Sequence, residues 1–479
     1  MSLLQKLNIS DAAFTPFLNT GSLCDLALGR FVPGINGSTI LSGGLGMTNG
    51  ITGKPQVYKS TQAHGWAIQI LERYPGSEYY IYDTEFSQGD KWRLVRSSSL
   101  YLDDPILRER HLEDLYHRIV VTNPEEVDLE SFFKKVKEIA ALKQAARKEY
   151  TVTSPILDPR TGQPLKMFIP TLVSVDSWSE AHALSAMENL DEKDASDSKN
   201  NTWFMGDGRV KKLIMSQIPA LAAKAGIYFI FTAHIGKVND MGSYMPTPKD
   251  MQYTKQGETT KGVGSAFSFL VSNVVEARKA TPITPDNKES QYRLPGSSST
   301  ATMEFSRVTD VVIRCKNNNS GSQFNTVVSQ KYGVLPCMTN YDYLREMKYP
   351  GLGGPGASRS PKSCFLPDAT GLGRTTCYET LLKNPALNRA IEITAQLVYV
   401  QNAWTVSDDD VPFSITPEKL VEELGKTTYA MSEILGSRGW WTYGGFDHIP
   451  YLSLFDILAI VKGTYKPKLV PVAAPTKKK

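Results

Sequence analysis

The length of 479 residues exceeds the usual size of a single compact core, so we expect either one large domain with appendages or two domains. The composition, with 41% hydrophobic and 21% charged residues, is ordinary for a soluble globular protein. A formal net charge of +4 is small for this length. It permits an anionic partner without indicating one, so a case for nucleic acid must rest on local sequence.

The cysteines and histidines narrow the class of protein further. Five cysteines are scattered without CxxC spacing, which favours free thiols in a reducing compartment over a disulfide framework. Six histidines, never in metal-ligand spacing, argue against a zinc site. The first residues lack a basic region followed by a long apolar stretch, and no run is long enough to span a bilayer. We therefore expect a cytoplasmic protein with no membrane partner.

The first half of the chain alternates between helical patterns and short apolar runs. A Gly-rich run is followed by a helix, a Tyr-Pro-Gly turn and an apolar strand, which together predict a βαβ unit. Alternation of this kind predicts an α/β fold, a mostly parallel twisted sheet with helices on both faces. In chain order we expect a helix over Thr61–Arg73, a strand over Tyr79–Tyr82, a helix over Leu129–Arg147, a strand over Thr171–Val175, a helix over Val210–Ala225 and a strand over Ile227–Ala233.

The second half contains long polar stretches, a hairpin pattern and a helical end. The stretches 236–264 and 281–302 are too long for simple connections, which favours functional or mobile loops. Apolar runs at Asp310–Arg314 and Phe324–Ser329 flank an Asn/Ser/Gly turn and predict a hairpin. A Gly/Pro/Ser-rich stretch then indicates a boundary before a mostly helical C-terminal region. The predicted division is an N-terminal segment over 1–39, a core over 40–345, a C-terminal region over 346–465 and a flexible basic tail over 466–479.

The segment from Gly53 to Ser60 keeps the spacing of the phosphate-binding pattern GxxxxGK[ST], with Tyr58 in place of the second glycine. In this pattern the backbone N–H groups of the loop and of the following helix converge on phosphate oxygens. A lysine, here Lys59, neutralises the β- and γ-phosphates, and a hydroxyl, here that of Ser60, binds Mg²⁺. On its own, the segment also fits a Gly-rich turn with an incidental Lys-Ser pair. The residues predicted to bind ATP are Gly53, Lys54, Pro55, Gln56, Val57, Tyr58, Lys59, Ser60 and Thr61.

Two acidic residues follow predicted strands. Asp176 ends the buried run LVSVD, where a phosphate-binding fold needs a carboxylate near its metal ion, so Ser60 and Asp176 are the predicted Mg²⁺ ligands. Glu85 lies just beyond the strand at Tyr79–Tyr82, at the edge where open parallel sheets bind ligands. There it could act as the general base for the water that attacks the γ-phosphate. The simpler alternatives are an aspartate that caps a turn and a solvated surface glutamate.

Six segments, in order between residues 40 and 335, resemble the RecA/UvsX recombinases, and the aromatic residue in the phosphate loop resembles the phage-type UvsX branch. They are the loop ending Tyr-Lys-Ser, YPGSEYYIYDTEF, LVSVDS, FMGDGRVKKLIMSQIPALAAKAGIYFIFTAHIGKV, ETTKGVGSAFSFLVSNVVEARK and RCKNNNSGSQFNTVVSQKYGV. The resemblance implies a RecA-like P-loop ATPase core whose catalytic lysine and glutamate are Lys59 and Glu85. It also places the family's adenine-stacking aromatic at Trp92, its polar sensor at His234, and a cation that reaches a neighbouring subunit's ATP at Lys316. Asn318 stands where relatives often have a second cation.

The same resemblance places two DNA-binding loops. The first, Trp203–Arg209, mixes aromatic, glycine and basic residues, the combination that suits base stacking and phosphate contact on a single strand. Without the resemblance, it would also fit a helix N-terminus with core aromatics. The second loop is rich in Gly, Thr and Lys and lacks apolar anchors, so we expect it to become ordered on DNA. The predicted DNA-binding residues are Phe204, Met205, Gly206, Arg209, Lys211, Thr259, Thr260, Lys261 and Gly262.

The resemblance therefore implies an ATP-dependent recombinase that polymerises into a helical filament on single-stranded DNA, pairs it with a homologous duplex and promotes strand exchange in recombination and repair. The expected cofactors are ATP and Mg²⁺, and the expected partners include a single-strand-binding protein and a loader. The N-terminal segment would serve as a subunit-packing arm, and a phage-encoded chain would act in the host cytoplasm. Two other functions stay open: a ring-forming DNA motor such as a replicative helicase, and a DNA-coating filament protein with a weak ATPase.

Overall fold

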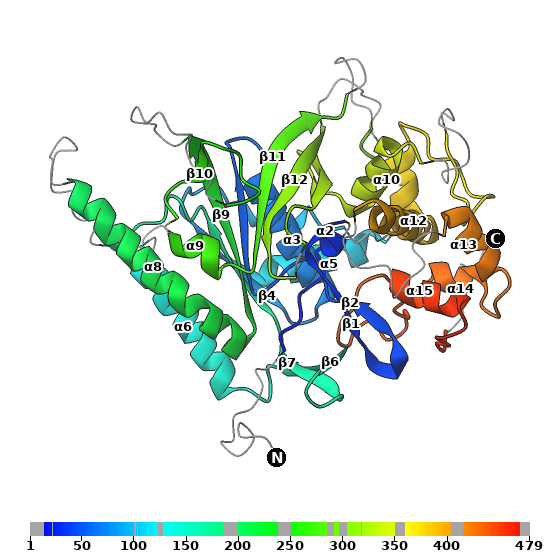
Figure 1. The fold of residues 1–479 in the computed structure, drawn as a ribbon, viewed down its shortest axis with the longest axis horizontal. Helices are drawn as coiled ribbons and strands as arrows, with labels where there is room; N and C mark the ends of the chain where they lie inside the picture. Colours follow the sequence, from blue (N-terminus) through cyan, green and yellow to red (C-terminus); the bar gives the residue numbers. More distant parts are fainter. Residues whose placement is uncertain are drawn as a thin grey trace.

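A mostly parallel sheet lies at the centre of the chain in the computed structural model (Figure 1). The structure describes residues 14–21, 23–99, 102, 104–122, 128–184, 200–237, 251–263, 265–284, 292–296, 304–317, 319–349, 360–403 and 415–469. Within these ranges the sheet has ten strands, in the order β14-β13-β12-β11-β3-β9-β8-β4-β5, with β10 paired to β9 beside this path. The strands from β11 to β5 run parallel, whereas β12, β13 and β14 continue the sheet in antiparallel fashion.

The bounds of these strands agree with the predicted βαβ pattern and hairpin. They are β3 Thr48–Gly53, β4 Glu78–Asp83, β5 Ile119–Val121, β8 Thr171–Asp176, β9 Ile227–Lys237, β10 Glu258–Thr260, β11 Asn273–Pro282, β12 Phe305–Cys315, β13 Gln323–Ser329 and β14 Gly333–Val334. The phosphate-loop strand β3 is buried along its whole length and lies between β11 and β9. The loop that follows it therefore opens near the middle of the sheet.

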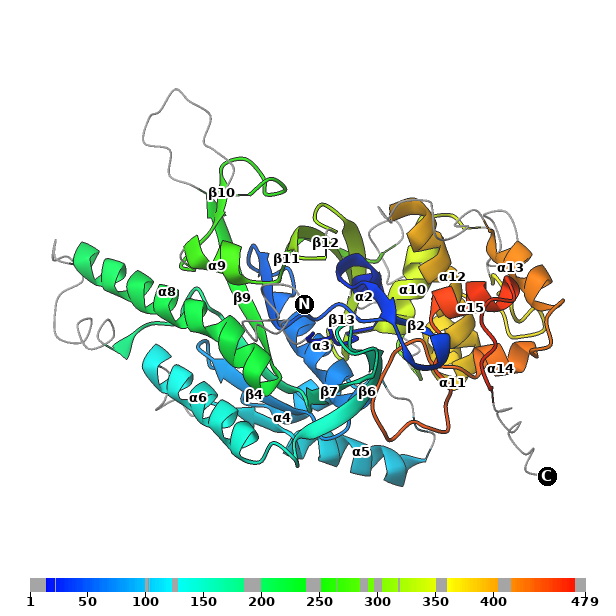
Figure 2. The ribbon, with the colours of Figure 1, turned by 60° about the horizontal axis from the view of Figure 1, so that its bottom comes forward.

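Helices cover both faces of the sheet, as predicted (Figure 2). Side chains of β9 alternate between the two layers: Phe229 and Phe231 pack with α6, α8 and α9, whereas Tyr228 and Ile230 pack with α3, α4 and α5. The bounds are α3 Lys59–Arg73, α4 Lys91–Val95, α5 Pro105–His117, α6 Leu129–Ala145, α8 Asn200–Ala225 and α9 Ser265–Leu270.

The C-terminal region is mostly helical, as predicted, and the N-terminal segment contacts it. The Trp441 backbone N–H donates to the Asn19 side-chain oxygen over 3.3 Å, and the Thr39 N–H donates to the Asp456 carboxylate over 2.7 Å. The described part of the predicted arm is thus held against its own chain, and residues 1–13 lie outside the described residues. The remaining elements are α2 Leu23–Leu28, β1 Phe31–Pro33, a short 3-10 turn at Ile35–Gly37, β2 Thr39–Leu41, β6 Thr151–Leu157, β7 Pro164–Phe168, α10 Pro336–Glu346, α11 Cys377–Lys383, α12 Pro385–Ala403, α13 Pro417–Leu424, α14 Met431–Leu435 and α15 Leu454–Val461.

Asp310, on β12, is a fully buried carboxyl group. It accepts hydrogen bonds from the Gln62 amide (3.2 Å) and the Thr326 hydroxyl (2.9 Å), yet burial raises its pKa to about 7. The folded chain therefore keeps a proton that the unfolded chain releases near pH 4. The free energy of unfolding therefore decreases as the pH rises from about 4 to about 7, because the unfolded chain ionises Asp310 more readily than the folded chain does.

We expect Asp310→Asn to raise the melting temperature by a few degrees at pH 8 and by less at pH 5, because the amide carries no charge to bury. The Gln62 Oε1 atom, which is buried without a hydrogen-bond partner, can accept from the new amide. Thermal denaturation followed by circular dichroism at both pH values measures the difference. A gain that is the same at both would contradict this account.

Candidate functional site

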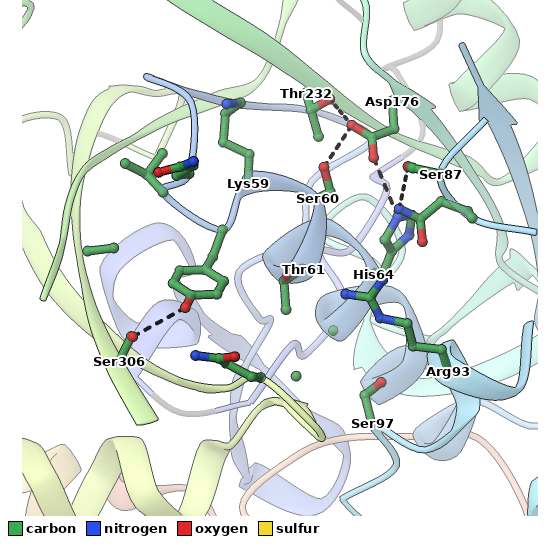
Figure 3. A pocket seen from close by; sticks show the side chains of 18 of the residues that line it. Lys59, Ser60, Thr61, His64, Ser87, Arg93, Ser97, Asp176, Thr232 and Ser306 are labelled. Atoms are coloured by element: carbon green, nitrogen blue, oxygen red, sulfur yellow. Dashed lines mark hydrogen bonds and ion pairs between the residues drawn. The ribbon is translucent and has the colours of Figure 1, made fainter. Parts of the chain in front are cut away.

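A cavity of about 810 Å³ opens at the carboxyl ends of β3, β4, β8 and β9 (Figure 3). This is the edge at which open parallel sheets bind ligands. The far wall of the cavity comes from α4 and from β11, β12 and the turn between β13 and β14. The predicted site residues that line it are Pro55, Gln56, Val57, Tyr58, Lys59, Ser60, Thr61, Glu85, Asp176 and His234.

The loop before α3 contains two residues in the left-handed region of backbone conformation. Gln56 has φ +63° and Tyr58 has φ +61°, a region that favours glycine. Tyr58 therefore adopts the conformation of the glycine that it replaces, at a cost of about 1 kcal/mol or more. Its hydroxyl lies 3.3 Å from the Ser306 hydroxyl on β12. N–H groups in a loop of this kind form a concave surface that suits an anion. The absence of the second glycine therefore does not remove this surface.

Lys59 is the first residue of α3, and its side chain is buried beside the loop. The ammonium group donates a 2.9 Å hydrogen bond to the Lys54 carbonyl, so it lies across the concave side of the loop. Burial lowers the pKa of Lys59, and the negative charges of Asp176 and Glu85 oppose that effect. This position, next to a helix N-terminus, fits a phosphate group.

Asp176 is the centre of a buried polar network (Figure 3). Its Oδ1 accepts hydrogen bonds from the Thr232 hydroxyl and, over 3.0 Å, from the Ser60 hydroxyl, and its Oδ2 lies 3.6 Å from His64 Nε2. Burial alone would raise the pKa of Asp176, but the nearby His64 imidazole and hydrogen bonds from Thr232 and Ser60 hold it below its ordinary value. An ionised carboxylate beside a hydroxyl is a donor set that suits Mg²⁺, so Ser60 and Asp176 fit the predicted ligands.

Glu85 lies in the loop after β4, and Asp83 fixes the backbone of that loop. Buried Asp83 accepts hydrogen bonds from the backbone N–H of Glu85 (3.1 Å) and of Gln88 (2.7 Å). The Glu85 carboxylate lies 3.5 Å from His234 Nε2, on β9. The predicted base and the predicted sensor are thus neighbours at the rim of one cavity.

Four of the residues predicted for ATP binding and catalysis lie outside the lining of this cavity: Gly53, Lys54, Trp92 and Lys316. Gly53 ends β3, where a Cβ atom would come within 2.7 Å of the Ala277 carbonyl, and Lys54 forms a 2.8 Å ion pair with Glu258. Lys316 follows β12 and donates to a backbone carbonyl of α9 over 3.4 Å. A role for it toward a neighbouring subunit stays a prediction.

Trp92 lies outside the cavity lining, so its role as the adenine-stacking aromatic stays a prediction. The indole stacks on Tyr116 at 4.6 Å between ring centroids, whereas Arg93 and Leu94 of α4, and Ser97 just after it, line the cavity.

The candidate DNA-binding residues lie on α8, on β10 and just after it. Arg209 and Lys261 are exposed, but Lys211 is buried: it lies 3.3 Å from the Asp207 carboxylate and donates to the Gly262 carbonyl over 2.8 Å. The charge of Lys211 thus already has partners inside the protein, and its contact with DNA stays a prediction. Lys211 joins the two candidate DNA segments. Gly206, Thr259 and Thr260 are half-buried, and the side chains of Phe204 and Met205, like residue Asn318, lie outside the described part.

Sequence reasoning missed several residues of the cavity, among them His64 and Thr232. Their positions carry a signal: His64 is four residues after Ser60 on α3, and Thr232 is two residues before His234 on β9. Both spacings bring side chains to one face of their element. Lys331, in the turn after β13, is a further cation in the lining.

Comparison with known proteins leaves the family open. Among the described residues, no helix is long and apolar enough to cross a membrane. No protein-family model matches the chain, and no curated protein matches it. The crystal structure of the RadB recombinase aligns with 62% of this chain and 94% of its own length, at 16% sequence identity and a TM-score of 0.31. That similarity is too distant to identify the chain, so its function has to be argued from the site.

Proposed function

We propose that this chain is an ATP-dependent recombinase with a RecA-like core that forms filaments on single-stranded DNA and promotes homologous pairing and strand exchange. The observation that carries the proposal is the convergence on one cavity of Lys59, Ser60, Glu85, Asp176 and His234. These residues come from four separate strand ends and were selected from the sequence for complementary roles in phosphate chemistry. A structural ion-pair network would not need a general base beside a phosphate-type loop.

Each residue has a role that its position supports. The loop from Lys54 to Tyr58 and the ammonium of Lys59 would hold the phosphates, while Ser60 and Asp176 would hold Mg²⁺. When bound, Mg²⁺ would neutralise charge on the phosphate oxygens. Glu85 would accept a proton from the attacking water, and Asp83 keeps the backbone of Glu85 in place for that task.

The contacts of His234 support a link between hydrolysis and DNA. The Lys261 N–H donates to the His234 carbonyl over 2.8 Å, and the Ser179 hydroxyl bridges the two residues. Single-stranded DNA bound at residues 259–262 would therefore act on the part of β9 that contains His234, the residue beside Glu85. We therefore propose that DNA stimulates hydrolysis through these contacts.

The remaining parts of the proposal concern assembly. A helical filament would bring Lys316 of one subunit toward the ATP of the next, and a homologous duplex, a single-strand-binding protein and a loader would be its further partners. These rest on the motif order in the sequence. These parts of the proposal are independent of the ATP site, so a result against them would not count against ATP binding.

Two measurements test the proposal. We expect ATP hydrolysis that rises several-fold with single-stranded DNA, and electron microscopy with a non-hydrolysable ATP analogue should show helical filaments on that DNA. Closed rings would favour a replicative motor, and nucleotide-independent coating would favour a DNA-coating protein with a weak ATPase. Absence of any DNA binding, with or without nucleotide, would contradict all of these functions.

A further inference from the structure

A second cavity, of about 380 Å³, lies at the opposite edge of the sheet from the first. Gly226 and Tyr228, at the start of β9, and Phe168, just before β8, contribute to its lining. The other ends of the same two strands reach the first cavity. Figures 1 and 2 show the C-terminal ends of α6 and α8 meeting near the β6–β7 hairpin at this edge.

Three cationic side chains from three different elements line the second cavity. Arg147 follows α6, Lys166 lies on β7, and Lys224 is in the last turn of α8. The lining contains no aspartate or glutamate, and within the described ranges none of the three cations is within ion-pair distance of a carboxylate. Like charges gathered without a counter-charge repel one another, so an anion between them would be stabilised.

The floor of the second cavity is apolar and firmly held. Phe168 and Tyr228 are buried, and the Tyr228 hydroxyl donates to the Pro16 carbonyl over 2.9 Å. The Arg147 guanidinium lies 5.6 Å from the centre of the Phe168 ring, close enough for a cation–π contact that orients it. Behind that ring, the buried Lys143 ammonium donates to the Ile169 carbonyl over 2.6 Å. The cavity thus combines a fixed apolar surface with cations at its rim.

We propose that this cavity binds a small phosphomonoester with a planar or apolar body. Three positive charges match a phosphate dianion better than a single carboxylate, and the arginine fork can hold two phosphate oxygens at once. The apolar floor would cover the body of the ligand. A volume of about 380 Å³ falls within the range of small-molecule pockets, whereas a nucleic acid strand would need an extended track. The proposal does not depend on the function proposed for the first cavity.

Phenyl phosphate, which has a planar body and one phosphomonoester, is a suitable probe, with phenol as its uncharged counterpart. Isothermal titration calorimetry of the full chain should show that phenyl phosphate binds, that phenol does not, and that benzoate binds more weakly. The combined variant Arg147→Ala, Lys166→Ala, Lys224→Ala should weaken phenyl phosphate binding by at least about tenfold. Lys212→Ala, which removes one positive charge at an exposed position on α8 outside the lining, should leave it unchanged.

The proposal is overturned if phenyl phosphate does not bind, or if the combined variant binds it as tightly as the unaltered chain, since the ligand would then occupy another site. Displacement of phenyl phosphate by a short single-stranded oligonucleotide would also overturn it, in favour of a nucleic acid contact. Circular dichroism establishes that each variant is folded. If the combined variant is not, Lys166→Glu alone, at an exposed position on β7, gives the same comparison.

Discussion

Lys59→Ala is expected to lower the rate of ATP hydrolysis by about 100-fold or more, because it removes the cation nearest the concave side of the loop. The Lys59 ammonium is buried beside that loop and has no other cation of the loop to replace it: Lys54 is half-exposed and paired with Glu258. We also expect weaker ATP binding, because Lys59 would already contact the triphosphate in the bound state, before hydrolysis. Phosphate release and the equilibrium binding of a fluorescent ATP analogue measure the two effects.

A matched control is Lys462→Ala, which removes one charge from an exposed position after α15. Its hydrolysis rate should equal that of the unaltered chain. If Lys59→Ala keeps DNA-stimulated hydrolysis, the loop from Gly53 to Ser60 is not the ATP site. The alternative of a Gly-rich turn with an incidental Lys-Ser pair would then be correct.

The fold was predictable because alternating helices and apolar strands leave few arrangements. Runs such as Ile227–Ala233 are apolar at every position except Thr232, which favours a strand covered on both faces, and the structure confirms this. The β6–β7 hairpin was not predicted. Its strands carry Ser154, Pro155 and Lys166 among apolar residues, so no clear alternation marks them. These two strands lie outside the main sheet. Burial therefore does not impose a regular apolar pattern on their sequence.

The site residues were predictable where the chemistry fixes their spacing along the chain. They were not predictable where side-chain packing decides which way a residue points. The order of Lys59, Ser60, Glu85 and Asp176 follows from strand ends meeting at one edge, and the structure places all four around one cavity. Tyr58 shows the limit of pattern matching, because the conformation normally supplied by glycine is present without it.

Lys211 shows the opposite limit. A lysine near a basic, Gly-containing segment is typical of a DNA contact, but its position four residues after Asp207 turns it inward to a buried carboxylate. Only the three-dimensional arrangement reveals which lysines of a basic segment already have partners. Arg209 and Lys261, which are exposed, stay the stronger candidates for DNA contact.

Glu85→Gln is expected to lower ATP hydrolysis by a factor of about 10²–10⁴ while ATP binding changes little. Glutamine has the same shape and can still form a hydrogen bond with His234, which lies 3.5 Å from the carboxylate, but it cannot accept the proton of the attacking water. Asp83 contacts the backbone of residue 85, so the loop should keep its position. Glu113→Gln, at an exposed position on α5, is the control for the loss of one negative charge.

The contrast between the two variants carries more weight than either alone. Lys59→Ala should impair binding and hydrolysis together, whereas Glu85→Gln should separate them, because in the proposed site Lys59 would face the phosphates and Glu85 the attacking water. A chain that binds ATP but hydrolyses it slowly should also hold DNA longer, so Glu85→Gln should form filaments with ATP that resemble those formed with a non-hydrolysable analogue. If Glu85→Gln hydrolyses ATP at the original rate, the base lies elsewhere in the cavity. If it loses ATP binding as fully as Lys59→Ala, then Glu85 supports the structure of the site rather than its chemistry.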